Sequence, residues 1–131
     1  MEHIGILGGS FNPPHIGHIR AAKHAAQALG LTRVLLVPAA RVPHKQSPME
    51  GATDPQRLEM TRLAVQNEPQ LEVCSLEIDR GGTSYTWDTI RQLRAQYPDA
   101  AFTLLLGSDM FQCFSQWQNA DLIAQNAALA V

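Results

Sequence analysis

The sequence predicts one α/β domain, a doubly wound parallel sheet with helices on both faces. Short, continuously apolar runs, typical of strands buried on both faces, alternate with longer segments of helical character. Two of these runs end in glycine-containing turns that lead directly into a helix. The 131 residues, of which 45% are hydrophobic, suffice for a single core.

In the first part of the chain, residues 3–7 are expected to form a strand. An alanine-rich helix follows at 19–29 and ends at Gly30, because glycine readily takes the left-handed conformation of a C-cap. The run at 34–37 predicts a second parallel strand. A proline-rich loop is expected at 39–51.

The next helix is expected to begin at a cap provided by Thr53 or Asp54. Its charged residues are predicted to face solvent, although Arg57 could instead contact one of two acidic side chains that follow. These charged residues are Arg57, Glu59 and Arg62, and the two acidic side chains are Glu77 and Asp79.

The second half repeats the alternation of strand and helix. Residues 71–75 predict a strand toward one side of the sheet, and 87–97 a helix capped by Thr86 or Ser84. The run at 101–106 is the clearest buried strand. A further helix is expected near 121–125, and a last strand, in mid-sheet, at 127–131.

The turn at residues 8–18, GGSFNPPHIGH, has residue types suited to binding phosphate. Without a Cβ, Gly8 and Gly9 can adopt positive φ and let a phosphate approach closely. His15 and His18 are three residues apart and therefore share one face of a first helical turn, where the helix dipole favours anions. Gly17 leaves room for a planar or bulky group. Alternatively, the two histidines cap the helix or lie in the core.

This stretch resembles the nucleotidyltransferase signature of a glycine pair, Phe, Asp-Pro and His-x-Gly-His, with Asn12 in place of the usual Asp. Over its length the chain is similar to the bacterial nicotinate-nucleotide adenylyltransferase family. The resemblance implies a Rossmann-like fold, with His15 and His18 as catalytic residues. It also implies that the turn binds ATP through Gly8, Gly9, Ser10, Phe11, His15 and His18.

Four further elements carry the resemblance. His44 and Lys45 match a PHK element that the family uses for the pyridine mononucleotide and its phosphate, and residues 84–89 match SYTxDT. The resemblance implies that backbone groups near Tyr85 and Thr86 bind the nicotinate carboxylate, that Gly107 and Asp109 contact adenosine, and that Trp117 stacks on the pyridine ring. The predicted substrate-binding residues are His44, Lys45, Ser84, Tyr85, Thr86 and Trp117. From the residues alone, other interpretations remain open. His44 and Lys45 could belong to a solvated basic loop, the segment at 84–86 and Asp109 could cap helices, and Trp117 could pack in the core.

The reaction implied is adenylyl transfer from ATP to nicotinate mononucleotide, giving deamido-NAD and pyrophosphate, with Mg²⁺ brought by ATP and no metal ligands from the protein. We expect direct attack by the mononucleotide phosphate, with the histidines stabilising developing negative charge. A sister enzyme, such as a phosphopantetheine adenylyltransferase, and an inactive nucleotide-binding fragment remain alternatives.

The composition and charge of the chain limit the classes of partner that it is expected to bind. The net charge of -2 gives no electrostatic reason for nucleic-acid or membrane binding, and no signal peptide or spanning run is visible. We expect a cytoplasmic protein in which Cys74 and Cys113 are reduced. The family's later ISSTxIR-type element, which grips the phosphates of ATP, does not occur in these 131 residues. We therefore expect a chain lacking its C-terminal part, with weak ATP binding and low activity; the oligomeric state is not predicted.

Overall fold

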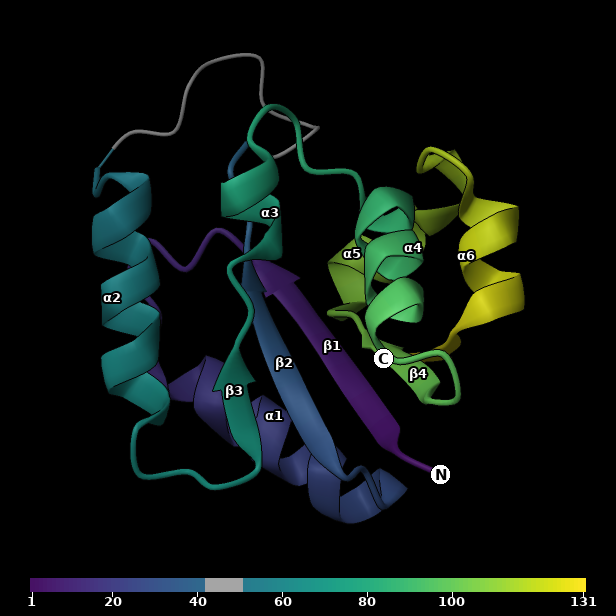
Figure 1. Ribbon diagram of the computed structural model, residues 1–131, viewed down its shortest axis with the longest axis horizontal. Coiled ribbons are helices and arrows are strands. Elements are labelled where there is room, and N and C mark those ends of the chain that lie inside the picture. The colour runs from purple at the N-terminus through teal and green to yellow at the C-terminus, as the bar shows by residue number, and fades with distance from the viewer. Residues whose placement is uncertain (42–50) are drawn as a thin grey trace.

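A computed structural model describes residues 1–41 and 51–131 and contains one sheet flanked by helices (Figure 1). Its five strands are all parallel and lie in the order β3-β2-β1-β4-β5. The doubly wound parallel architecture predicted from the sequence is confirmed. The strands are β1 (His3–Gly9), β2 (Arg33–Pro38), β3 (Leu71–Val73), β4 (Ala101–Leu105) and β5 (Ala128–Ala130).

The helices lie on both faces of this sheet, and Figure 1 shows α1 crossing behind it. They are α1 (Ile16–Leu29), α2 (Asp54–Val65), α3 (Leu76–Arg80), α4 (Thr86–Gln96), α5 (Ser108–Gln112) and α6 (Ala120–Asn126), with a 3₁₀ turn, η1 (Phe114–Gln116). In the described part of the chain, no helix combines the length and apolar character needed to cross a membrane.

Successive side chains of a strand point to opposite faces of the sheet, so the core has two halves. In β2, Val34 and Leu36 face a cluster that includes residues of α1 and α2, whereas Leu35 and Val37 face a cluster with residues of α4, η1 and α6. All four are almost inaccessible to solvent, which explains why this strand is a continuous apolar run. The sheet is therefore covered on both sides.

The topology places a crevice beside β1. From β1 the chain proceeds outward to β2 and β3, and then returns to β4 on the other side of β1. In open α/β sheets, ligands bind at such a switch point, outside the carboxyl ends of the strands. The two glycine-containing segments that the sequence singled out lie at these carboxyl ends: Gly8 and Gly9 end β1, and Gly107 follows β4.

Four features of the elements differ from the expectations. The first strand continues through Gly9, beyond its predicted end, and α3 was not predicted. The last strand pairs with β4 and lies at the edge of the described sheet, not in its middle. Arg57 does not face solvent but is fully buried, and its carboxylate partner is Asp54.

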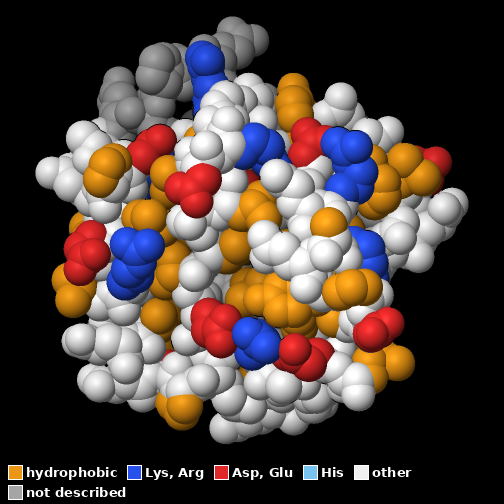
Figure 2. Space-filling model, viewed as in Figure 1, with side chains coloured by type: hydrophobic (Ala, Val, Ile, Leu, Met, Phe, Trp, Pro, Cys, Tyr) orange, Lys and Arg blue, Asp and Glu red, His pale blue; other side chains and the backbone are white. Residues whose placement is uncertain are grey.

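Charged side chains on the face seen in Figure 2 are interspersed by sign. Among the ion pairs of the described residues, Arg33 lies between Glu2 and Glu72, at 2.7 and 3.2 Å from their carboxylate oxygens. Exposed ion pairs of this kind contribute little to stability. They do, however, leave no extended basic patch on this face of the molecule.

Candidate functional site

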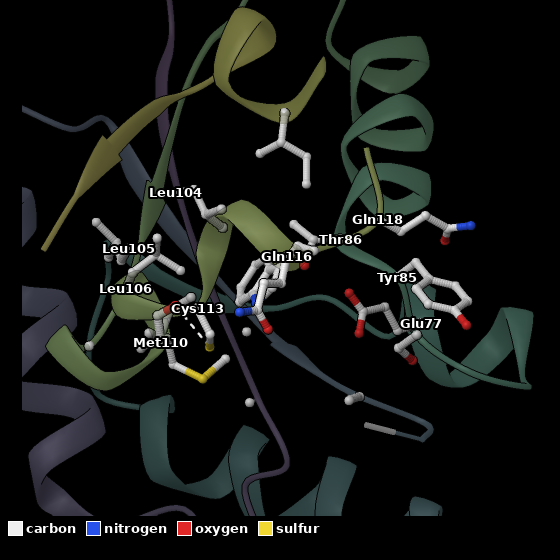
Figure 3. A pocket seen from close by; sticks show the side chains of 18 residues that line it. Glu77, Tyr85, Thr86, Leu104, Leu105, Leu106, Met110, Cys113, Gln116 and Gln118 are labelled. Carbon is white, nitrogen blue, oxygen red and sulfur yellow. Dashed lines mark hydrogen bonds between the residues drawn. The ribbon is translucent and has the colours of Figure 1, made fainter. Parts of the chain in front are cut away.

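A cavity of about 530 Å³ opens at the switch point (Figure 3). Its walls come from the carboxyl ends of β1 and β4, from the first turn of α4, and from the segment between α5 and α6. This volume suits a small organic ligand. Among the predicted site residues, the cavity brings together Gly8, Gly9, Ser84, Tyr85, Thr86, Gly107 and Trp117.

The glycine pair has a different conformation from the one expected. Gly8 and Gly9 are the last residues of β1 and do not have positive φ. A Cβ on Gly8 would meet no atom within 4 Å, so the backbone there is open on the side where a side chain would stand. Gly8 thus leaves the backbone bare at the cavity wall, and neither glycine supplies the positive φ that was expected.

Positive φ occurs instead at Phe11, with a value of 47°. This is uncommon for a bulky residue and costs on the order of 1 kcal/mol or more. The ring of Phe11 is buried, and it lies 3.6 Å from where a Cβ on Gly9 would stand. Packing of this ring therefore fixes the turn between β1 and α1.

His15 and His18 form a reciprocal cap at the start of α1. The Gly17 amide donates to Nδ1 of His15, and the His15 amide donates to Nδ1 of His18, each at 3.0 Å. The two rings stack with centroids 3.8 Å apart, and Phe11 contacts the His18 ring edge-on at 4.8 Å. The histidines therefore do cap the helix, as the alternative interpretation held.

Capping does not remove the histidines from ligand chemistry. Because each Nδ1 accepts a hydrogen bond, the proton of the neutral ring resides on Nε2, which is then a donor. The pKa of His18 lies below its ordinary value of 6.5, mainly because the ring is partly buried and to a smaller extent because of electrostatic repulsion from His15. At neutral pH, His18 is therefore an uncharged Nε2–H donor.

Gly17 is explained by this arrangement. A Cβ at this position would lie 2.8 Å from the His15 ring. The planar group for which Gly17 leaves room is thus the neighbouring imidazole. A side chain there would displace His15 from its capping position.

The first turn of α4 faces the cavity through Tyr85 and Thr86. The expected cap by Ser84 or Thr86 was wrong, since no side chain of the described residues caps this helix. Ser84 is buried, and its hydroxyl accepts from the Ala40 amide at 3.0 Å, which ties α4 to the end of β2. The backbone amides of this turn are thus not used by a capping side chain, and an anion is favoured there.

Glu77 is a buried carboxylate in the cavity wall that sequence reasoning did not single out as a site residue. The Thr89 hydroxyl donates to its Oε2 at 2.6 Å, and Arg80 donates to the same hydroxyl at 3.3 Å. In Figure 3 its carboxylate points into the cavity. Burial raises the pKa of Glu77 above its ordinary value of 4.5, while hydrogen bonds from Thr89 and Ser84 and the charge of Arg80 oppose this rise.

Replacing Glu77 by Gln is expected to stabilise the protein more at pH 8 than at pH 4. A carboxyl whose pKa is raised by folding favours the folded state below the unfolded pKa, and loses this contribution as the pH rises through the folded pKa. Glutamine stays neutral and can still accept from Thr89. Urea unfolding at both pH values measures the difference, with Glu59→Gln, an exposed site, as the control. A difference between parent and Glu77→Gln that does not change with pH would contradict the expectation.

Trp117 and the turn after β4 complete the cavity. Trp117 is partly buried and packs against Phe114 with ring centroids 5.3 Å apart, so it serves both the core and the cavity wall. A Cβ on Gly107 would lie 2.8 Å from Oδ1 of Asp109, so the Asp109 carboxylate folds back over Gly107. Asp109 itself is exposed in the first turn of α5.

The cavity does not unite all predicted site residues. Ser10, Phe11, His15 and His18 belong to the turn that follows its β1 wall, and Asp109 lies beyond Gly107, so none of them lines it. His44 and Lys45 lie outside the described residues. Glu77 follows Gly9 by 68 residues in the sequence, yet it reaches the same cavity as Gly8.

An open parallel sheet with a cavity at its switch point and the N-terminus of α4 at that cavity define an α/β protein of the class that binds ligands at the carboxyl ends of its strands. A cytidylyltransferase-like family model matches residues 6–131, and the chain belongs to this family. It is 46% identical over 118 residues to a protein of Acidithiobacillus ferrooxidans named a probable nicotinate-nucleotide adenylyltransferase, covering 90% of this chain and 53% of that one. A Salinibacter ruber protein of the same name is 41% identical over 128 residues, covering 98% of this chain and 65% of that one.

The resemblance inferred from the motifs is thus confirmed, although this chain spans only about half to two thirds of the length of these relatives. A solved structure confirms the fold. The Plasmodium falciparum nicotinic acid mononucleotide adenylyltransferase complexed with NaAD superimposes with a TM-score of 0.82 at 20% identity, covering 98% of this chain and 63% of that one.

Proposed function

We propose that this chain carries the catalytic site for adenylyl transfer from ATP to nicotinate mononucleotide, giving deamido-NAD and pyrophosphate. The observation that carries the proposal is the cavity at the switch point, where the backbone is bare at Gly8 and no side chain of the described residues caps the helix N-terminus at Tyr85 and Thr86. The names of the relatives, and the NaAD bound to the Plasmodium enzyme, support this substrate pair.

The phosphates of ATP are proposed to lie along the β1–α1 turn. Gly8, Gly9 and Ser10 provide backbone approach, Phe11 supports the turn, and the Nε2–H groups of His15 and His18 donate to phosphate oxygens. Gly107 and Asp109 are the candidates for the adenosine side, since Asp109 is short, acidic and exposed. With His18 uncharged, the stacked pair avoids the repulsion between two imidazolium rings.

The chemistry requires no covalent enzyme intermediate. A phosphate oxygen of the mononucleotide attacks the α-phosphorus of ATP; the new P–O bond forms as the bond to the β-phosphate oxygen breaks, and pyrophosphate leaves with that electron pair. The nucleophile is already anionic at neutral pH, so no general base is needed. His15 and His18 act by stabilising the charge that develops on the phosphate oxygens.

The mononucleotide is proposed to bind at the opposite wall. Its pyridine ring stacks on Trp117, and its carboxylate accepts hydrogen bonds from the first turn of α4 near Tyr85 and Thr86, with Ser84 fixing that turn. The candidate contribution of His44 and Lys45 remains a prediction from the sequence.

Mg²⁺ is expected to arrive with ATP. Within residues 1–41 and 51–131, no three His, Cys, Asp or Glu side chains are grouped so that they could hold a metal ion. The described residues thus offer no cage of their own, and the phosphates would supply ligands for the cation. Its chemistry, when bound, is to neutralise phosphate charge.

Incubation of the chain with Mg-ATP and a panel of acceptors tests the proposal. We expect deamido-NAD to form from nicotinate mononucleotide, with no transfer to phosphopantetheine. Calorimetric titration with the mononucleotide alone separates binding from turnover: binding without product indicates a non-catalytic fragment, and transfer to phosphopantetheine indicates the sister enzyme. The absence of both mononucleotide binding and product formation would refute the assignment for this chain.

A further inference from the structure

Arg57 is a fully buried cation that the proposed mechanism does not use. Its Nη2 donates to Oδ1 of Asp54 at 2.6 Å, and its Nη1 donates to the backbone carbonyl of Ser10 at 2.7 Å. Burying a guanidinium is costly, because it keeps its charge. The Asp54 side chain is 45% exposed, so its carboxylate would be well hydrated without this partner. The ion pair alone therefore does not account for the burial.

Ser10 is the first residue after β1, so its carbonyl lies at the start of the turn that leads to the histidines. It is followed by Phe11, whose φ of 47° persists only if the surrounding structure holds it. The Phe11 ring in turn contacts His18 edge-on at 4.8 Å. A movement of the Ser10 peptide would therefore be passed to the His18 ring through one intervening residue.

A second contact joins the same two segments. Oδ1 of Asn12 accepts from the Ala52 amide at 3.1 Å, just before Thr53, whose side chain caps α2. The start of α2 thus holds the turn on both sides of Phe11, through Arg57 at Ser10 and through Asn12. Oδ1 accepts here, which a carboxylate could also do, so an Asn at this position keeps the contact.

We propose that Arg57 is a positioning residue that fixes the β1–α1 turn and thereby sets the position of the His18 ring. The effect on ligand binding rests on the proposed function, whereas the effect on the ring does not. The guanidinium holds two partners at once with two donors in one rigid plane. A lysine ammonium is a single point charge and cannot keep both contacts in that geometry.

Four variants test this inference. Arg57→Met removes both contacts, and Arg57→Lys keeps the charge. Arg62→Met makes the same change at an exposed position of α2, and Val65→Ala destabilises the buried face of α2 away from the turn. The first readout is the set of His18 ring signals in ligand-free NMR spectra; the second is the dissociation constant for Mg-ATP.

We expect the His18 signals to shift in Arg57→Met, to shift less in Arg57→Lys, and to keep their positions in both controls. The affinity for Mg-ATP should fall about tenfold in Arg57→Met and change less than about twofold in the controls, as expected for a misplaced binding group. His18 signals that move no more in Arg57→Met than in Val65→Ala overturn the proposal. If Arg57→Met does not fold, unshifted signals in Arg57→Lys overturn it instead.

The two proposals fail separately. If the parent chain does not bind Mg-ATP, the proposed function fails, and the ligand-free signals still decide whether Arg57 positions His18. If Mg-ATP binds to the parent but the His18 signals move no more in Arg57→Met than in Val65→Ala, only the positioning role fails.

Discussion

His18→Asn should fold as well as the parent chain but form deamido-NAD about a hundredfold more slowly. In the parent chain the His15 amide nitrogen lies 3.0 Å from Nδ1 of His18. The asparagine Oδ1 can replace this Nδ1 as the acceptor, so the cap of α1 is kept. Nothing replaces the Nε2–H donor. The loss of one positioned donor to a developing charge typically costs a factor of this size.

His18→Gln is the complementary variant. Its terminal amide can reach the place of Nε2 and donate, but it lacks an acceptor at the place of Nδ1. We expect it to retain more turnover than His18→Asn and to lose about 1 kcal/mol of stability through the weakened cap. Product formation and urea unfolding are measured on the same samples, with His24→Gln as an exposed control on the same helix. Equal turnover in parent and His18→Asn would remove His18 from the mechanism.

Trp117→Ala should weaken binding of nicotinate mononucleotide by about 10- to 100-fold, because stacking of a ring on an aromatic side chain contributes about 1–3 kcal/mol. Its effect on Mg-ATP binding should be much smaller, since the proposed phosphate site lies at the β1–α1 turn. Calorimetric titration with each ligand measures both affinities. The decisive result is the difference between the two losses of affinity, because a general loss of packing would weaken the binding of both ligands.

Two variants control for the packing role of Trp117. Trp117→Phe keeps an aromatic face against Phe114 and should recover most of the affinity. Phe114→Leu disturbs the same cluster from the buried side and should affect stability more than ligand selectivity. If Trp117→Ala and Phe114→Leu reduce mononucleotide affinity equally, Trp117 acts through packing and not through stacking.

The sequence by itself determined the features that depend on local pattern. Continuous apolar runs marked β1, β2 and β4, Gly30 marked the end of α1 with a φ of 62°, and the motifs identified the family. It also placed His15 and His18 at the first turn of α1. These features follow from backbone preferences and side-chain spacing, which act over a few residues.

Only the tertiary structure decided which distant groups meet. Arg57 has the appearance of a surface charge on α2, yet the β1–α1 turn covers it and accepts its hydrogen bond at Ser10. Glu77 reaches the cavity because α3 packs beside the first turn of α4, where Thr89 donates to it. The balance between desolvation and partners decides the position of a buried charge, and those partners are set by the three-dimensional arrangement of segments far apart in the sequence.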